Sequence, residues 1–236
     1  MQETDSLVTR KEHPLPIEYG LNNRFRPYAC IRTLGVFSVD NDMLIPTEYM
    51  DFTFETWRLF KRHIVGFAIR TAKKSVEPKW EGLHEVHWPG WAAGNVPGHS
   101  LEYNLVFTNA AIFHRELLND YTCAMPKEAA QMITDLRSCE DIAMNVLSYA
   151  KWQAHPIGIT TTKGCVDNYG VGPKFKRDEG GLAKSGDMDT YALFRGKCYR
   201  RLCEWLGTDI PMSTVTSQAY NDRALCPPGH KKPGQF

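Results

Sequence analysis

Gly35-Val36-Phe37-Ser38-Val39-Asp40-Asn41-Asp42 is the stretch from which the rest of the sequence is best interpreted. Its first five residues form an apolar run that predicts a buried strand. Residues two apart on an extended backbone point to the same side, so Asp40 and Asp42 share one side of the strand end. Two carboxylates there repel each other unless a cation lies between them, and Mn²⁺ or Mg²⁺ prefers such oxygen ligands. The same three residues are also ordinary turn chemistry, and both interpretations stay open.

The composition is that of a globular protein with a substantial core. The chain has 236 residues, of which 42% are hydrophobic, 11% aromatic and 23% charged. A formal net charge of +1 gives no reason to expect nucleic acid or an anionic membrane as a partner. No stretch approaches the roughly 18 to 20 apolar residues that would span a bilayer.

The seven cysteines leave the cellular compartment open. None of them forms a Cys-x-x-Cys pair, which is the usual mark of a structural zinc site. If disulfides form, the odd count leaves at least one free thiol. The cysteine spacing therefore argues against structural zinc but does not choose between a reducing and an oxidising compartment.

Apolar patterns along the chain alternate between strand and helix. The expected strands cover residues 35–39, 64–69 and 156–160, with a strand or a strand-turn-strand over 103–113, and the expected helices cover residues 48–60, 126–136, 139–149 and 191–205. This alternation is typical of an α/β protein.

Two sets of charged residues admit both a functional and a structural interpretation. Arg24 and Arg26 precede the acidic stretch, where arginines can bind a diphosphate in a bidentate manner or simply lie in solvent. Glu140 and Asp141 open a helix, where they can act as a base or a nucleophile. With Ser138 as N-cap and Asp141 at N3, they also fit a helix start whose acids complement the helix dipole.

The segment His84-Glu85-Val86-His87 suggests a third possibility, a zinc hydrolase. The metalloprotease helix motif places its histidines at i and i+4, however, and the spacing of three here misses it. A zinc role is therefore the weakest of the interpretations.

Taken together, several stretches resemble the exostosin-like glycosyltransferase domain, a family that makes or modifies heparan-sulfate-type and related glycans. The matching segments are residues 21–28, 36–42, 54–57, 64–67 with Arg70, 102–111, 139–145, and Arg195 with Cys198. The most specific of them is Cys139-Glu140-Asp141-Ile142-Ala143-Met144-Asn145. The resemblance covers about residues 13 to 206.

The resemblance implies a GT-A-type α/β fold, with a mixed, mostly parallel sheet flanked by helices and a nucleotide-sugar site at the strand ends. It identifies Asp40-Asn41-Asp42 as the family's DxD motif. Asp42 would be the most direct ligand of Mn²⁺ (or Mg²⁺), and Asp40 and Asn41 would lie near the ribose or the metal. The family usually has three acids here, so Asn41 removes one charge. Asn23 and Arg24 would contact the nucleotide diphosphate.

The resemblance also assigns the chemistry to the second half of the chain. Asp141 would lie by the anomeric carbon in a retaining transfer, with Glu140 beside it. Arg195 would offset charge as the leaving group departs. Cys139 and Cys198 match a family disulfide, which points to an oxidising compartment and hence to the lumen of the endoplasmic reticulum or Golgi.

Three parts of the chain are expected from this resemblance. Residues 1–14 would be disordered or a fragment end, residues 15–206 the glycosyltransferase domain, and residues 207–236 an irregular C-terminal tail. Family domains begin with a further strand-helix-strand unit, which nothing before residue 15 can supply. The domain is therefore expected to be incomplete at its N-terminus, and any membrane anchor would belong to that missing part.

Two functional hypotheses from different classes follow. The first is a metal-dependent, retaining glycosyltransferase that moves a sugar from a UDP-sugar donor to a glycan acceptor, with N-acetylhexosamine as the favoured sugar. The second is a catalytically inactive glycan- or partner-binding domain on the same fold. Neither involves nucleic acid, and assembly with a copy of itself or with another chain is left open.

Overall fold

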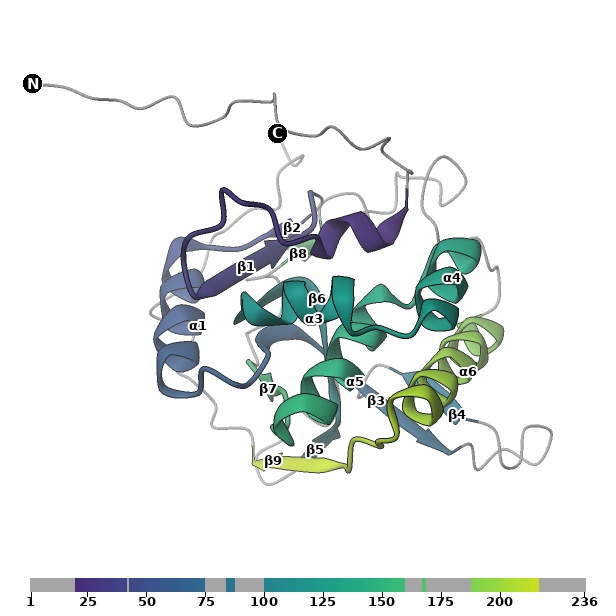
Figure 1. Ribbon diagram of the computed structural model, residues 1–236. Coiled ribbons are helices and arrows are strands. Elements are labelled where there is room, and N and C mark those ends of the chain that lie inside the picture. Colours follow the sequence, from purple (N-terminus) through teal and green to yellow (C-terminus); the bar gives the residue numbers. More distant parts are fainter. Residues whose placement is uncertain are drawn as a thin grey trace, which may run out of the picture.

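The structure is a computed structural model that describes residues 20–41, 43–74, 84–87, 100–159, 167–168 and 188–216. Figure 1 shows a sheet with a layer of helices in front of it: α3 (Glu116–Cys123), α4 (Lys127–Leu136), α5 (Glu140–Trp152) and α6 (Met188–Leu206). The expected α/β class, with a mixed sheet flanked by helices, is therefore confirmed.

The main sheet has five strands: β1 (Gly35–Val39), β3 (Val65–Lys74), β4 (His84–His87), β6 (Leu105–His114) and β7 (Ile157–Gly158). Their order is β1-β6-β3-β4, with β7 beside β3. Among the described residues, the β3–β7 pairing is parallel, whereas β1–β6, β3–β6 and β3–β4 are antiparallel. The expectation of a mostly parallel sheet is wrong for these strands. Alternating helices and strands predict the layers, but strand direction depends on how each connection returns the chain.

Two short antiparallel pairs lie outside this sheet. β2 (Met43–Leu44) pairs with β8 (Asp167–Asn168), and β5 (Ser100–Tyr103) pairs with β9 (Ser213–Thr216). β9 falls in the region that was expected to be an irregular tail, so that expectation is wrong for these four residues.

Strand β6 is the centre of the sheet and of the core. It lies between β1 and β3, and all of its residues except Asn109 and His114 are buried. It is one continuous strand, so the alternative of a strand-turn-strand is wrong. Asn109 lies where β1 ends, since the Asp40 N–H donates to the Asn109 carbonyl at 2.8 Å.

Neighbouring residues of β6 face opposite sides of the sheet, as the strand period requires. Ile112 packs with Trp57 and Val65 in a small cluster beneath α1 (Thr47–Leu59). Ala111 and Phe113 belong to the main core, which α3 to α6 cover. The sheet is therefore buried on both faces along β6.

The expected helices at 48–60, 126–136 and 191–205 are confirmed by α1, α4 and α6. The expected strand at 156–160 is shorter, since β7 covers only Ile157–Gly158. None of the helices in the described ranges is long and apolar enough to cross a bilayer.

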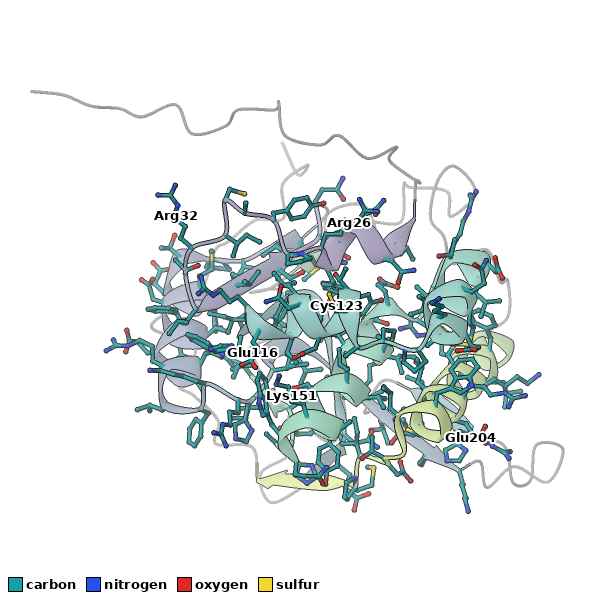
Figure 2. The ribbon with its side chains drawn as sticks, viewed as in Figure 1. Arg26, Arg32, Glu116, Cys123, Lys151 and Glu204 are labelled. Carbon is teal, nitrogen blue, oxygen red and sulfur yellow. A yellow bond between two sulfur atoms is a disulfide. The ribbon has the colours of Figure 1, made fainter. Side chains whose placement is uncertain are left out.

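The far end of α5 is fixed to α3 by charge. The Lys151 ammonium lies 2.7 Å from a carboxylate oxygen of Glu116 and 2.7 Å from one of Asp120, and Figure 2 shows Lys151 and Glu116 side by side. The first turn of α5 carries Glu140 and Asp141 at its opposite end.

Gly66 is expected to be intolerant of any side chain. A Cβ built there would lie 2.5 Å from the Ala110 carbonyl oxygen and 2.6 Å from the Ala111 Cβ, at the point where the β3–β6 register shifts. Gly66→Ala should therefore lower the free energy of unfolding by about 3 kcal/mol or more, measured by chemical denaturation.

Gly207→Ala is the matched comparison. This glycine has φ +61° and nothing within 4 Å of the added Cβ, so only backbone strain of about 1 kcal/mol should appear. Equal losses at the two positions would contradict the close approach of β3 and β6.

Candidate active site

The candidate site lies around the middle of β6, where β1 ends and α5 begins. The short 3-10 helix η1 (Leu21–Phe25) brings Arg24 there, because its last residue, Phe25, is buried against the rings of Phe113 and Tyr121. The Asn22 side chain fixes the same helix to α4 by donating to the Ala130 carbonyl at 2.9 Å.

The Arg24 guanidinium joins three parts of the site. Nη2 lies 2.5 Å from the Asp40 carboxylate, and it donates to the Ser38 hydroxyl at 2.9 Å and to the Thr108 carbonyl at 2.7 Å. The side chain is 23% exposed, so part of it remains accessible to solvent. The interpretation of Arg24 as simply solvated surface is therefore wrong.

Asn23 precedes Arg24 in η1. Its carbonyl accepts a hydrogen bond from the Tyr28 hydroxyl at 3.0 Å. This places Asn23 beside the candidate diphosphate contact Arg24, while its own contact with a nucleotide stays a prediction.

The acidic stretch after β1 forms a tight turn. The Met43 N–H donates to the Asp40 carbonyl at 3.1 Å, and Asn41 is exposed in the turn. The Asp40 side chain is 36% exposed and pairs with Arg24. Asp42, the expected metal ligand, lies outside the described residues. Turn chemistry is therefore present here, and metal binding at the same residues stays a prediction.

The donor set for a metal is only partly described. Within the described residues, no group of three or more His, Cys, Asp or Glu is placed to hold a metal ion. Asp40 supplies a carboxylate of the chemistry that Mn²⁺ or Mg²⁺ takes, although one of its oxygens already faces Arg24. The residues fit a divalent cation only if Asp42 joins Asp40.

The zinc interpretation depends on the two histidines of β4. His84 is in β4, and its ring lies 5.8 Å from the ring of Tyr199 in α6. The side chain of His87 is outside the described part of the structure. The described residues give this interpretation no support.

Helix α5 starts differently from the sequence expectation. Its N-cap is Cys139, which has φ 79° and makes no side-chain capping bond, so Ser138 is not the cap. Asp141 is consequently at N2 and not at N3. One Asp141 carboxylate oxygen accepts from the Ile142 N–H at 2.8 Å and also pairs with Arg195. The two acids lie at the positive end of the helix dipole, where acidic side chains stabilise the start of a helix.

The carboxyl of Glu140 has a raised pKa. Burial raises the pKa of its carboxyl to about 7, and the adjacent charge of Asp141 contributes in the same direction. Arg195 and Arg24 act in the opposite direction, each lowering this pKa. Arg24 and Arg195 also contact neighbouring residues of β6, since Arg24 bonds to the Thr108 carbonyl and Arg195 lies over the Phe107 ring, so the two halves of the predicted site lie close together.

Arg195 reaches the site from α6. Its side chain is buried, pairs with Asp141, and lies over the ring of Phe107, with 4.3 Å from Cζ to the ring centroid. The expected disulfide between Cys139 and Cys198 is present. It joins the cap of α5 to α6 at a position three residues after Arg195, and thus links the two helices that hold the ion pair.

Two further residues belong to this arrangement without having been assigned a role from the sequence. Asn145 is buried, and its side chain bonds to both the N–H and the carbonyl of Val106 and to the Asp141 carbonyl. Arg70 lies over the Phe107 ring, with 4.7 Å from Cζ to the centroid. In the sequence, Asn145 and Arg70 are each a polar residue within an apolar run. This pattern was the available indication that they have a specific role.

The structure therefore brings Arg24, Asp40, Glu140, Asp141 and Arg195 into one site. Its acids and guanidiniums are arranged in two ion pairs, with Glu140 under the influence of both. Guanidiniums in such positions are suited to binding a phosphate or diphosphate, and paired acids are suited to proton transfer or nucleophilic attack.

Comparison with known proteins finds exostosins and a plant mannosyl transferase among the similar proteins. Exostosin-1 from Bos taurus is 34% identical over 205 residues, which is 87% of this chain and 24% of the relative. Exostosin-1b from Danio rerio is 29% identical over 205 residues, 87% of this chain and 25% of the relative. Glycosylinositol phosphorylceramide mannosyl transferase 1 from Arabidopsis thaliana is 33% identical over 147 residues, 59% of this chain and 42% of the relative.

The chain thus spans about a quarter of the length of these exostosins and less than half of the plant protein. Residues 16–222 match the glycosyl transferase family 64 domain, which takes in both halves of the site described above. This protein belongs to glycosyl transferase family 64.

Proposed function

We propose that this chain is a retaining glycosyltransferase domain that moves a sugar from a UDP-sugar donor to a glycan acceptor with the help of Mn²⁺ or Mg²⁺. The observation that carries the proposal is that the Asp141–Arg195 and Asp40–Arg24 ion pairs meet at neighbouring residues of β6, because Arg195 lies over the Phe107 ring and Arg24 bonds to the Thr108 carbonyl. Membership of family 64 supports glycosyl transfer as the reaction.

Each arginine has a distinct part in this proposal. Arg24, in η1 and paired with Asp40 after β1, would meet the donor diphosphate on its exposed side. Arg195, buried behind Asp141, would offset the negative charge that develops as the nucleotide diphosphate departs. Asp42 with Asp40 would hold the cation, which would add its positive charge at the diphosphate when bound.

The acids would serve the transfer itself. In a retaining reaction the bond from the anomeric carbon to the diphosphate oxygen breaks, and the acceptor oxygen bonds on the same face. Asp141 would lie by that carbon, and its pairing with Arg195 fixes the position of its carboxylate. Glu140, with a pKa of about 7, is poised to hold or release a proton near neutral pH. Either a covalent intermediate or same-face attack is compatible with these placements.

The sugar is proposed to be an N-acetylhexosamine. Relatives of this chain include both exostosins and a protein named as a mannosyl transferase, so the donor has to be tested directly. Incubation with UDP-N-acetylglucosamine, UDP-N-acetylgalactosamine and GDP-mannose, with release of nucleotide as the readout, separates these donors.

The buried Cys139–Cys198 disulfide favours the secretory-pathway lumen as the location. A bridge that joins the Asp141 and Arg195 helices would be maintained only in an oxidising compartment.

Metal-dependent donor binding is the first prediction of the proposed function. UDP should bind to the full chain with Mn²⁺ present, as followed by calorimetry, and EDTA should abolish the binding. Asp42→Asn should abolish it too, with the thermal melt nearly unchanged, because a carboxamide is a poor ligand for a hard cation. Asp51→Asn, in the exposed part of α1, is the matched control.

The absence of heat at millimolar UDP with Mn²⁺ would reject the enzyme and favour the inactive glycan- or partner-binding domain. Wild-type binding by Asp42→Asn would instead reject the metal assignment alone.

Loss of the charge of Asp141 is the second prediction. Asp141→Asn should keep donor binding within about threefold but lower transfer at least a hundredfold, since general acid–base or nucleophilic groups contribute about 10²–10⁴. It should also lower stability by roughly 3 kcal/mol, because Arg195 loses its buried partner. Asp135→Asn, on the exposed side of α4, is the control, and unchanged turnover in Asp141→Asn would return Asp141 to a structural role.

The pH dependence of stability tests the electrostatics of Glu140. Its pKa is about 7 in the folded chain against an ordinary value of 4.5, so the folded state holds the proton more tightly than the unfolded state. Its stabilising contribution is complete below pH 4.5 and is lost as the pH rises through about 7. Glu140→Gln should therefore be more stable than wild type by about 3 kcal/mol at alkaline pH, and equal to it at acidic pH.

Chemical denaturation between pH 4.5 and 8.5 gives this difference, with Glu128→Gln on the exposed surface of α4 as the control. Parallel stability curves for wild type and Glu140→Gln would show that the carboxyl titrates normally.

A further inference from the structure

The ring of Phe107 is shared by two cations. The guanidinium carbon of Arg195 lies 4.3 Å from its centroid and that of Arg70 lies 4.7 Å from it. Phe107 is 7% exposed, Arg195 7% and Arg70 8%, so all three side chains are removed from water. Cation–π attraction is strongest under these desolvated conditions.

The ring and Asp141 together offset the repulsion between the two guanidiniums. Two guanidiniums beside one ring repel each other in a medium of low dielectric constant, where water screens little. Asp141 neutralises Arg195 by direct pairing. The face of the Phe107 ring attracts both cations without adding a charge of its own, and it restricts the orientation of the planar guanidinium above it.

The backbone under the ring is held firmly. Val106 donates its N–H to the Asn145 side chain at 3.0 Å and accepts from it at 2.8 Å. On the other side, the Thr108 carbonyl accepts from Arg24 at 2.7 Å. Phe107 therefore stands on a segment of β6 that is bonded to both α5 and η1, so its ring is a fixed platform for the side chain that arrives from α6.

We propose that Phe107 is a positioning residue for the transfer reaction: its ring holds the Arg195 guanidinium in the orientation that faces Asp141 and the departing diphosphate. The effect on rate rests on the proposed function, whereas the effect on Arg195 does not. A core residue of equal bulk without an aromatic ring would fill the space but would remove the π face against which the guanidinium lies.

Three variants isolate the ring. Phe107→Leu keeps apolar bulk and removes the π face, and Phe107→Tyr restores the face. Phe67→Leu is the matched control, because Phe67 lies in β3, packs against the small cluster beneath α1 and has ring contact with Tyr49 of that helix. Phe107→Met replaces Phe107→Leu if the latter does not fold, as judged by its thermal melt.

The first measurement needs no substrate. Arginine Nε–Hε NMR signals of the whole chain are recorded, and those of Arg195 and Arg70 are assigned by their loss in Arg195→Lys and Arg70→Lys. In Phe107→Leu the Arg195 signal should move as the ring current is lost, and it should exchange faster with water. Phe107→Tyr and Phe67→Leu should leave it in place.

The second measurement is sugar transfer with the donor found above. Phe107→Leu should lower kcat about tenfold with the donor KM within twofold, since a desolvated cation–π contact is of that size. Phe107→Tyr should recover the rate, and Phe67→Leu should keep it. An unmoved Arg195 signal, a wild-type kcat in Phe107→Leu, or an equal loss in Phe67→Leu overturns the proposal. If wild type transfers no sugar, the proposed function fails, and the NMR comparison alone decides whether Phe107 positions Arg195.

Discussion

The buried ion pair between Asp141 and Arg195 is the interaction on which the site depends. A buried guanidinium or carboxylate is costly unless it is paired and hydrogen bonded, so each residue requires the other in place. The pair joins α5 to α6, and the Cys139–Cys198 bridge joins the same two helices close by. The disulfide and the ion pair thus both hold the start of α5 against α6. Together they limit how far Arg195 can move from Asp141.

Strand β6 connects this ion pair to the other half of the site, which contains Arg24 and Asp40. Asn145 in α5 bonds to the backbone of Val106, and Arg24 bonds to the carbonyl of Thr108. Because the β1 pairing covers only the Ala110–His114 part of β6, polar groups earlier in the strand are available to a side chain. Asn145 takes the place of a neighbouring strand there, and this fixes the first turn of α5 against the sheet.

The sequence predicted the layers and most helix positions, because apolar periodicity is a local property. The candidate site residues came from the family resemblance, and their roles stay predictions. The sequence did not predict strand directions: the antiparallel placement of β6 between β1 and β3 depends on contacts between residues far apart in the chain. The N-cap of α5 was also misplaced. Ser138 has the side chain of a cap, but the disulfide partner Cys139 occupies that position with a left-handed backbone.

Roles that depend on contacts between distant parts of the chain were the hardest to predict from the sequence. Phe107 reads as one apolar residue in a buried strand, and only the fold brings Arg70 and Arg195 over its ring. The pKa of Glu140 likewise follows from burial and from charges on η1, α5 and α6, which no local pattern contains.

The charge balance of the site also bears on its cofactor. With Glu140 protonated, Arg24 and Arg195 are matched by Asp40 and Asp141, so the two ion pairs are close to neutral together. A nucleotide diphosphate brings at least two further negative charges into a partly buried space, where their repulsion from Asp40 and Asp141 would be poorly screened. A divalent cation held by the acidic turn after β1 would supply compensating positive charge, and this physical requirement, as much as the spacing of Asp40 and Asp42, is the reason to expect one.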